Sequence, residues 1–269
     1  MLCCRRQFSN PVMTERYNRQ TLLPQIGSQG QEKLNKASVL VIGVGGLGSP
    51  ALTYLAAAGV GHLGVVDSDT VTLSNLNRQF LHNISDIGKL KVESAKEKLF
   101  NLNNEIEIKI YNERLTGENA KSIFSGYNII LGAVDSYEIR FVINKACVSL
   151  GIPYIDGGVN GFSGCVLFSN PPQTPCLNCI FPETGEKKEP SGILGTTAGI
   201  IGTIEANVAI LHLLDLPNPI GNKLLLYDGL FMNFEYRDIK RRDNCHVCSY
   251  GKNLKPDEKF EPLPLLDGG

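Results

Sequence analysis

Residues 37–48 read ASVLVIGVGGLG, a short apolar run that ends in a cluster of glycines. An apolar run of this length, bounded by glycine, is typical of a strand buried on both faces of a parallel sheet. The small residues 49–58 predict a helix after it, and residues 63–67 predict a second strand. Strand, helix and strand in this order form a βαβ unit, which indicates a doubly wound sheet with right-handed crossovers.

The alternation of strands and helices continues along the chain. Further helices are expected over residues 89–101, 117–124 and 137–150, and further strands over 106–111, 127–134 and 152–156. After about residue 157 the pattern changes, and antiparallel strands are expected over 164–168, 223–228 and 231–238. A buried helix is expected over 198–214, too short and too interrupted to span a membrane. The predicted fold class is α/β, with a Rossmann-like, doubly wound and mainly parallel sheet that continues into antiparallel strands.

Composition narrows the class of function. The chain has 269 residues, with 26 basic and 27 acidic side chains and a net charge of -1. This balance argues against a general nucleic-acid or membrane-surface binder, which carries a basic excess. The first residues lack the apolar core of a secretory signal, so we expect a cytoplasmic protein with no membrane or nucleic-acid partner. Eight cysteines then indicate metal ligands or catalytic thiols rather than disulfides.

The glycine cluster predicts a nucleotide-binding loop. Gly43, Gly45 and Gly48 fit the pattern G-x-G-x-x-G between the first strand and its helix. Glycines permit a tight turn close to phosphates, and the helix N-terminus offers free N–H groups and a positive dipole end. Asp67 ends the second strand, where a carboxylate can accept hydrogen bonds from ribose hydroxyls. These residues indicate an adenine nucleotide but do not choose between NAD and ATP.

Three charged residues favour ATP. Arg78 and Lys91 follow the strand end that carries Asp67, and a triphosphate that loses pyrophosphate needs cations around it. Asp135 follows another buried strand and could hold a phosphate-bound magnesium, which takes one or two carboxylates. Charged residues are more often solvated surface, and spacing alone leaves both interpretations open for Arg78 and Lys91.

Two CxxC pairs predict a structural zinc site. They comprise Cys176 with Cys179 and Cys245 with Cys248. Four thiolates make a closed tetrahedral site with no open position for catalysis. A redox-active CxxC is the alternative, and the presence of a second pair disfavours it. Cys147 and Cys165 are expected to be small buried residues.

Taken together, these motifs resemble the ThiF/MoeB/HesA family, the bacterial relatives of ubiquitin-activating enzymes. The resemblance runs from about Arg16 to Cys248 and rests on residues 16–20 (RYNRQ), 43–48 (GVGGLG), 67–69 (DSD), 73–79 (LSNLNRQ), 91–95 (KVESA) and the paired CxxC motifs. It implies an ATP-dependent adenylyltransferase that acts on the C-terminal Gly-Gly carboxylate of a small ubiquitin-like sulfur-carrier protein. The product would be a carrier adenylate and pyrophosphate, in molybdopterin or thiamine biosynthesis.

The resemblance also implies roles for individual residues. Gly46 would lie in the phosphate loop and Asp67 would bind ribose. The phosphate contacts would come from Asn75, Arg78 and Lys91.

Two further roles depend on a metal ion and on a second subunit. Asp135 would hold magnesium, and Arg19 would reach the phosphates of the partner subunit, because members of the family are homodimers. The family often has Thr-Asp-Asn around the acid, whereas this chain has Val134-Asp135-Ser136. The carboxylate is therefore kept, but the role of its neighbours is not implied.

The same resemblance predicts the domain organisation. A flexible tail is expected over residues 1–15, a single adenylation domain over 16–250 and a C-terminal tail over 251–269. Within the domain, residues 37–157 would bind nucleotide and 158–250 would hold the carrier and zinc. A mobile loop is expected over 183–190. The chain ends in Gly268-Gly269, for which a coincidental end and a pseudo-substrate both stay open.

Some relatives carry a further cysteine that forms a persulfide or thioester with the carrier. The loop expected over residues 180–203, which would hold it near Ser191, contains no cysteine. We therefore expect adenylation without a covalent enzyme–carrier thioester, with sulfur from an unidentified donor. Three alternatives remain, namely activation of another peptide C-terminus, an NAD-dependent oxidoreductase and a non-catalytic zinc-stabilised binding module.

Overall fold

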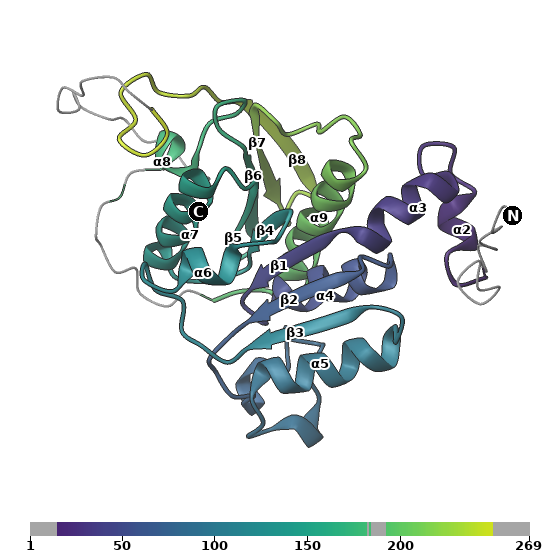
Figure 1. The fold of residues 1–269 in the computed structure, drawn as a ribbon. Coiled ribbons are helices and arrows are strands. Elements are labelled where there is room, and N and C mark those ends of the chain that lie inside the picture. The colour runs from purple at the N-terminus through teal and green to yellow at the C-terminus, as the bar shows by residue number, and fades with distance from the viewer. Residues whose placement is uncertain (1–14, 182, 184–191, 250–269) are drawn as a thin grey trace, which may run out of the picture.

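The computed structural model describes residues 15–181, 183 and 192–249 (Figure 1). The tails expected over 1–15 and 251–269 lie outside this range apart from Glu15. Residues 184–190 of the expected mobile loop, Ser191 and the terminal Gly268-Gly269 lie outside it as well.

One eight-stranded sheet runs through the domain in the order β3-β2-β1-β4-β5-β6-β7-β8. Its strands are β1 (Ser38–Ile42), β2 (His62–Val66), β3 (Glu107–Tyr111), β4 (Ile129–Gly132), β5 (Tyr154–Asn160), β6 (Ser163–Ser169), β7 (Lys223–Asp228) and β8 (Asn233–Asp238). The pairs among β1 to β5 are parallel, and the pairs from β5 to β8 are antiparallel. The predicted sheet, parallel first and antiparallel afterwards, is therefore confirmed.

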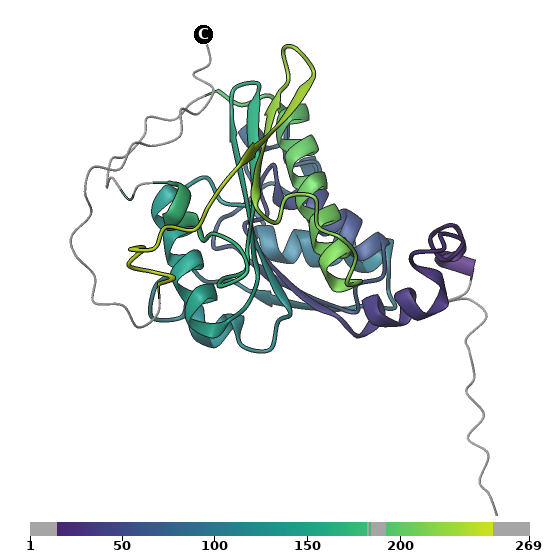
Figure 2. The same ribbon diagram turned by 90° about the horizontal axis from the view of Figure 1, so that it is seen from above.

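Helices cover both faces of this sheet (Figures 1 and 2). One face carries α3 (Gly27–Lys36), α4 (Gly48–Ala57), α5 (Lys91–Leu102) and α9 (Gly195–Leu213). The other face carries α6 (Ala120–Phe124), α7 (Tyr137–Leu150) and α8 (Leu177–Ile180). The remaining short helices are α2 (Asn18–Thr21), η1 (Leu73–Asn75) and η2 (Ile84–Asp86).

The strand β1 shows why its sequence is apolar at successive positions. Val39 and Val41 pack into the core under α4 and α9, whereas Leu40 and Ile42 pack into the core under α6 and α7. Side chains of a strand alternate between the two faces of the sheet, so a strand covered on both sides needs apolar residues throughout. All four side chains are buried.

The helix α7 matches its predicted bounds at both ends because each end carries a clear signal. The Ser136 side chain accepts a hydrogen bond from the Ile139 N–H at the start, a typical N-cap. Gly151 ends the helix in the left-handed conformation, with φ 67. In contrast, α3 was not expected, because it buries only Gly30, Gln31 and Leu34 and so shows a weak apolar pattern.

The predicted start of α9 was wrong. The helix begins at Gly195 rather than at Ala198. The sequence pattern missed the first turn because its small residues, which lie against the chain near Arg78, give no apolar signal. The last nine residues of the loop expected over 180–203 are therefore helical.

The helix expected over 198–214 was described as too short and too interrupted to span a membrane, and this description was also wrong. At 19 residues, α9 is the one helix in the described part of the chain that is long and apolar enough to cross a membrane by length and composition. It packs against α4, β5 and β6 in this structure, and its residues Thr197, Ala198, Ile201 and Glu205 are buried there.

Candidate active site

The glycine loop lies between β1 and α4 and leaves no room for a side chain at Gly43 or at Gly48. Gly43 has a φ of +96, and a Cβ atom on it would lie 2.4 Å from the Ala133 carbonyl oxygen at the end of β4. A Cβ atom on Gly48 would lie 2.0 Å from the Gly43 carbonyl oxygen. Non-glycine residues rarely adopt such a φ and cannot make such approaches. The loop is therefore closed tightly over the N-terminus of α4, as the glycine pattern predicted.

Replacing Gly48 by alanine is expected to destabilise the protein by about 1–3 kcal/mol, because the new methyl group overlaps the Gly43 carbonyl and pushes the loop open. Chemical denaturation of both proteins measures this loss. Gly117→Ala is the matched control, since a Cβ atom there meets nothing within 4 Å. Equal stability of the two variants would contradict the close approach.

Asp67 is fixed to the glycine loop by its side chain. One carboxylate oxygen, Oδ2, accepts a hydrogen bond of 2.8 Å from the Val44 N–H. The other, Oδ1, accepts one of 2.9 Å from the Asp69 N–H. Each carboxylate oxygen has a second lone pair, so Asp67 can accept further hydrogen bonds from a ligand above the loop.

Arg78 lies beside the glycine loop from a different part of the chain. A Cβ atom on Gly46 would lie 3.6 Å from the Arg78 Cγ atom and 3.0 Å from Ala198 in α9. The guanidinium donates from Nη1 to the Ser74 carbonyl and to the Asn77 side chain. Its Nε and Nη2 have no partner within the described ranges, so they can donate to a phosphate.

Asn75 and Lys91 are held near the same loop. The Asn75 side chain accepts a hydrogen bond from the Thr72 N–H and caps η1, which leaves its amide nitrogen as a donor. Lys91, the first residue of α5, is buried, and its Nζ atom lies 2.9 Å from the exposed carboxylate of Asp69. An ammonium group with an exposed partner can exchange that partner for a ligand anion.

The site lies where the strand order reverses. From β1 the chain proceeds outward through β2 to β3, and from β4 it proceeds the other way to β5. Ligands of open α/β sheets bind at the carboxyl ends of the strands at such a switch point. Gly43 follows β1 and Asp135 follows β4, so both residues border this crevice. Asp135 is exposed and has no hydrogen-bond or ion-pair partner among the residues described.

The structure does not bring Arg19 to this site within one chain. Arg19 lies on α2, and α2 lies against the C-terminal end of α4, where Gln20 donates to the Ala58 carbonyl. The glycine loop lies at the other end of α4, and a ten-residue helix is about 15 Å long.

Two buried residues beside the loop were missed by the sequence analysis. His82 makes a hydrogen-bond contact with the Val44 carbonyl, and Gln79 lies near Gly45 with its Oε1 unpartnered in the described part of the chain. No spacing marked His82, because its partners are a backbone carbonyl and a serine from other segments. The one signal in the sequence was that Gln79 and His82 lie between Arg78 and Lys91, the residues predicted to contact phosphate.

The four cysteines of the CxxC pairs meet at one point. The sulfur atoms of Cys176, Cys179, Cys245 and Cys248 all lie within 4.8 Å of one another. Three of the sulfur–sulfur distances are 3.4, 3.6 and 3.8 Å. A tetrahedron with Zn–S bonds of about 2.3 Å has S–S edges of about 3.8 Å, so the cluster could hold zinc.

The other two cysteines in the described part of the chain, and His246, lie outside this cluster. Cys147 and Cys165 are buried elsewhere, and burial raises the pKa of both thiols. His246 lies 3.9 Å from Glu183 and is not part of the cluster.

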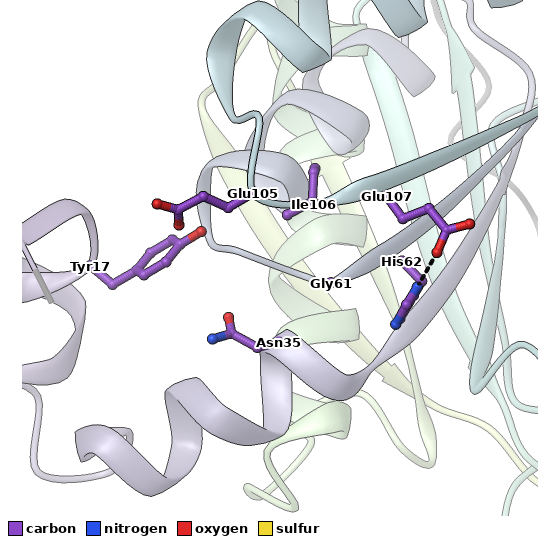
Figure 3. Close-up of a pocket in the computed structure, with 7 residues that line it drawn as sticks. All are labelled: Tyr17, Asn35, Gly61, His62, Glu105, Ile106 and Glu107. Carbon is purple, nitrogen blue, oxygen red and sulfur yellow. Dashed lines mark hydrogen bonds and ion pairs between the residues drawn. The ribbon is translucent and has the colours of Figure 1, made fainter. Parts of the chain in front are cut away.

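A small cavity lies at the end of the sheet where β2 and β3 begin (Figure 3). Its volume is about 210 Å³, and Tyr17, His62, Glu105 and Glu107 are among its lining residues. His62 and Glu107 begin β2 and β3, whereas the glycine loop follows the end of β1. This cavity is therefore separate from the switch-point crevice, and we assign no substrate to it.

The parallel sheet, the glycine loop at its switch point and the four-cysteine cluster define a Rossmann-like α/β protein with a candidate nucleotide site. Residues 17–247 match the ThiF family, and the chain belongs to that family.

Curated relatives agree with this assignment. The chain is 40% identical to a sulfur carrier protein adenylyltransferase of Thermus thermophilus, over 87% of this chain and 90% of that protein. It is also 40% identical to the adenylyltransferase and sulfurtransferase MOCS3 of Culex quinquefasciatus, over 89% of this chain. The chain spans little more than half of that relative, 56% of its length. The expected enzyme class, adenylyltransferase, is thereby confirmed.

Solved structures share the fold. Escherichia coli MccB with ATP superimposes with a TM-score of 0.78 at 24% identity, over 87% of this chain and 74% of that one. MccB with the peptide MccA-N7isoASN gives a TM-score of 0.79. These likenesses confirm the Rossmann-like fold expected from the sequence.

Proposed function

We propose that this enzyme uses ATP to adenylate the C-terminal Gly-Gly carboxylate of a small ubiquitin-like sulfur-carrier protein, with release of pyrophosphate. The pathway would be molybdopterin or thiamine biosynthesis. The observation that supports this most is the gathering of Asp67, Arg78 and Lys91 around one glycine loop at the switch point. The naming of two relatives as adenylyltransferases supports it independently.

The chemistry needs cations and alignment rather than a general base. A C-terminal carboxylate has a pKa of about 3.3–3.7, so it is ionised at neutral pH and is already a nucleophile. A carboxylate oxygen must approach the α-phosphorus of an anionic nucleotide. The new oxygen–phosphorus bond of the mixed anhydride forms as the bond from the α-phosphorus to the oxygen of the leaving pyrophosphate breaks. Positive side chains stabilise the charge that develops on the leaving pyrophosphate.

Each residue then has a role in this proposal. The backbone of residues 43–48 would receive the phosphates, Asp67 would bind the ribose hydroxyls, and Asn75, Arg78 and Lys91 would contact the phosphates. Lys91 would exchange Asp69 for a phosphate oxygen.

Asp135 would hold magnesium in this proposal. Its exposed carboxylate, which has no partner among the described side chains, fits an ion that takes one or two carboxylates and otherwise water and phosphate. The bound ion would neutralise phosphate charge.

The second subunit and the cysteine cluster complete the proposal. Arg19 would act across a homodimer, because within its own chain it lies at the far end of α4.

The four-cysteine cluster would hold zinc in a structural role, since four thiolates leave no open position. It joins α8 to the segment after β8, on the half of the domain proposed to bind the carrier.

An exposed apolar surface supports carrier binding beside the nucleotide site. This carrier surface comprises Phe162, Leu194, Leu230, Phe231 and Met232. Its parts are joined by backbone hydrogen bonds from Gly229 to Phe162 and from Leu194 to Gly161. Leu194 precedes Gly195, which packs against Asn77 and Arg78. A carrier bound on this surface could therefore extend its C-terminus to the phosphates.

Changing Phe231 to aspartate is expected to raise the KM for the carrier at least about tenfold, since the ring is 81% exposed and its burial by a partner would be lost. The affinity for ATP should stay unchanged. Steady-state adenylation kinetics with a purified carrier measure both quantities. Phe100→Asp, on the exposed side of α5, is the control, and an equal KM increase in that variant would argue against this surface.

ATP–pyrophosphate exchange tests the proposal as a whole. Exchange that depends on a small sulfur carrier ending in Gly-Gly, and is lost when its last glycine is removed, is the expected result. Exchange with an unrelated peptide instead would indicate activation of another C-terminus, and NAD reduction without exchange would indicate an oxidoreductase. A carrier adduct that survives denaturation and is released by thiols would contradict the absence of a thioester step.

A further inference from the structure

His82 lies buried between the glycine loop and α5, with 5% of its surface exposed. Its Nε2 atom is 3.2 Å from the Val44 carbonyl oxygen in the glycine loop. Its Nδ1 atom is 2.8 Å from the Ser94 hydroxyl in the second turn of α5. The ring therefore bridges two segments that supply proposed nucleotide contacts.

The partners of the ring determine its tautomer. A carbonyl oxygen only accepts hydrogen bonds, so Nε2 carries the hydrogen and donates it to Val44. The Nδ1 atom shares a hydrogen bond with the Ser94 hydroxyl, which also interacts with the buried carboxylate of Asp86. Burial lowers the pKa of His82 and outweighs the hydrogen bond to Val44 and the charges of Asp86 and Asp67, which raise it, so the neutral ring is favoured at pH 7.

Val44 is held at both of its backbone polar groups. Its N–H donates to Asp67 and its carbonyl accepts from His82. The residues on either side are Gly43 and Gly45, which restrict the backbone least of all residue types. These two side-chain contacts therefore fix the backbone orientation of Val44, between two glycines that restrict the backbone little.

We propose that His82 is a positioning residue for nucleotide binding, which holds the glycine loop in its receiving conformation and ties it to the start of α5. Since Lys91 begins α5 and Ser94 lies one turn later, the same ring keeps loop and lysine in register. The inference rests on the proposed function, because it assumes that the loop receives ATP.

Two substitutions separate the two ends of the ring. In His82→Gln the amide nitrogen falls near the position of Nε2 and can still donate to Val44. In His82→Asn the amide group falls near Nδ1, so the contact with Ser94 is kept and the contact with Val44 is lost. Asparagine is smaller than glutamine, so a role in packing alone would also favour His82→Gln. His82→Met separates the two roles, because methionine keeps about the length of glutamine but cannot donate to Val44, and it should therefore bind ATP as weakly as His82→Asn.

Calorimetric titration of the full chain with MgATP is the first measurement, because it needs no carrier. His82→Asn is expected to bind ATP about tenfold more weakly, and His82→Gln within about twofold of the unmodified protein. In the exchange assay the KM for ATP should follow the same order while kcat at saturating ATP changes less. His212→Asn, a half-buried histidine on α9 away from the loop, should bind ATP normally.

Hydrogen exchange without ligand is the second measurement. The amides of residues 43–48 should exchange faster in His82→Asn than in His82→Gln. If His82→Asn does not fold, Ser94→Ala carries the test, with an expected threefold loss of ATP affinity and faster exchange over the same residues.

The outcomes distinguish this inference from the proposed function. No binding of ATP by the unmodified protein would contradict the proposed function. Normal ATP binding by the unmodified protein, together with equal affinity and equal loop exchange in His82→Asn and His82→Gln, would overturn the role of His82 alone. For Ser94→Ala, unchanged affinity and unchanged loop exchange would overturn it likewise.

Discussion

Replacing Arg78 by alanine is expected to lower the rate of ATP–pyrophosphate exchange by about 10²–10³-fold, the usual loss when one transition-state contact is removed. The side-chain stem of Arg78 lies beside Gly46, and its Nε and Nη2 are unpaired in the described part of the chain, so the guanidinium could neutralise charge on the departing pyrophosphate of the proposed reaction. Asp135→Ala should reduce exchange to a similar extent, through loss of the proposed magnesium ligand.

Fold and charge effects need separate controls in this experiment. Arg78 is half-buried and Asp135 is exposed. Both variants should therefore keep the thermal stability of the unmodified protein. Lys36→Ala removes a positive charge at the opposite edge of the sheet, where Lys36 pairs with Glu32, and should leave exchange intact. Near-normal exchange in Arg78→Ala or Asp135→Ala would remove that residue from the mechanism.

Removing the zinc proposed for the cysteine cluster is expected to give the largest loss of stability. The two CxxC pairs are about 65 residues apart, and a cross-link that closes such a loop is worth roughly 4 kcal/mol by the loop-closure entropy argument applied to disulfides. Cys245→Ser or chelation should therefore lower the melting temperature by about 8–16 °C. Differential scanning calorimetry with and without a strong chelator measures this change.

Metal content decides whether the loss comes from zinc. The unmodified protein should contain one zinc per chain, and Cys245→Ser should contain much less. Cys147→Ala is the control, because Cys147 is buried on α7 outside the cluster and its loss should leave the zinc content unchanged. A melting temperature insensitive to chelation in a zinc-loaded sample would contradict a stabilising role.

Local signals explain how much of the fold could be predicted. The strand β1 was predicted because both faces of a covered parallel strand must be apolar, and α7 because Ser136 and Gly151 mark its ends. The helix α3 was missed because few of its residues are buried, and the start of α9 was misplaced because its first turn is made of small residues. Boundaries without caps or apolar periodicity left no local signal.

The residues proposed for the candidate site come from local signals of the same kind. Gly43, Gly48, Asp67, Arg78 and Lys91 were predicted from motif and resemblance, and the structure gathers them at one sheet edge. The part played by Asp69 as the partner of Lys91 could not be predicted, because it depends on where the side chains of separate segments point.

The sequence by itself determined the strand and helix pattern, the glycine loop and the four zinc-type cysteines, since each is encoded within a few neighbouring residues or a recognisable motif. Only the tertiary structure decided that His82 bridges Val44 and Ser94, that the cysteine pairs meet, and that Arg19 lies at the far end of α4. Such contacts join residues tens of positions apart, and the distance between them is a property of the packed chain rather than of any local stretch.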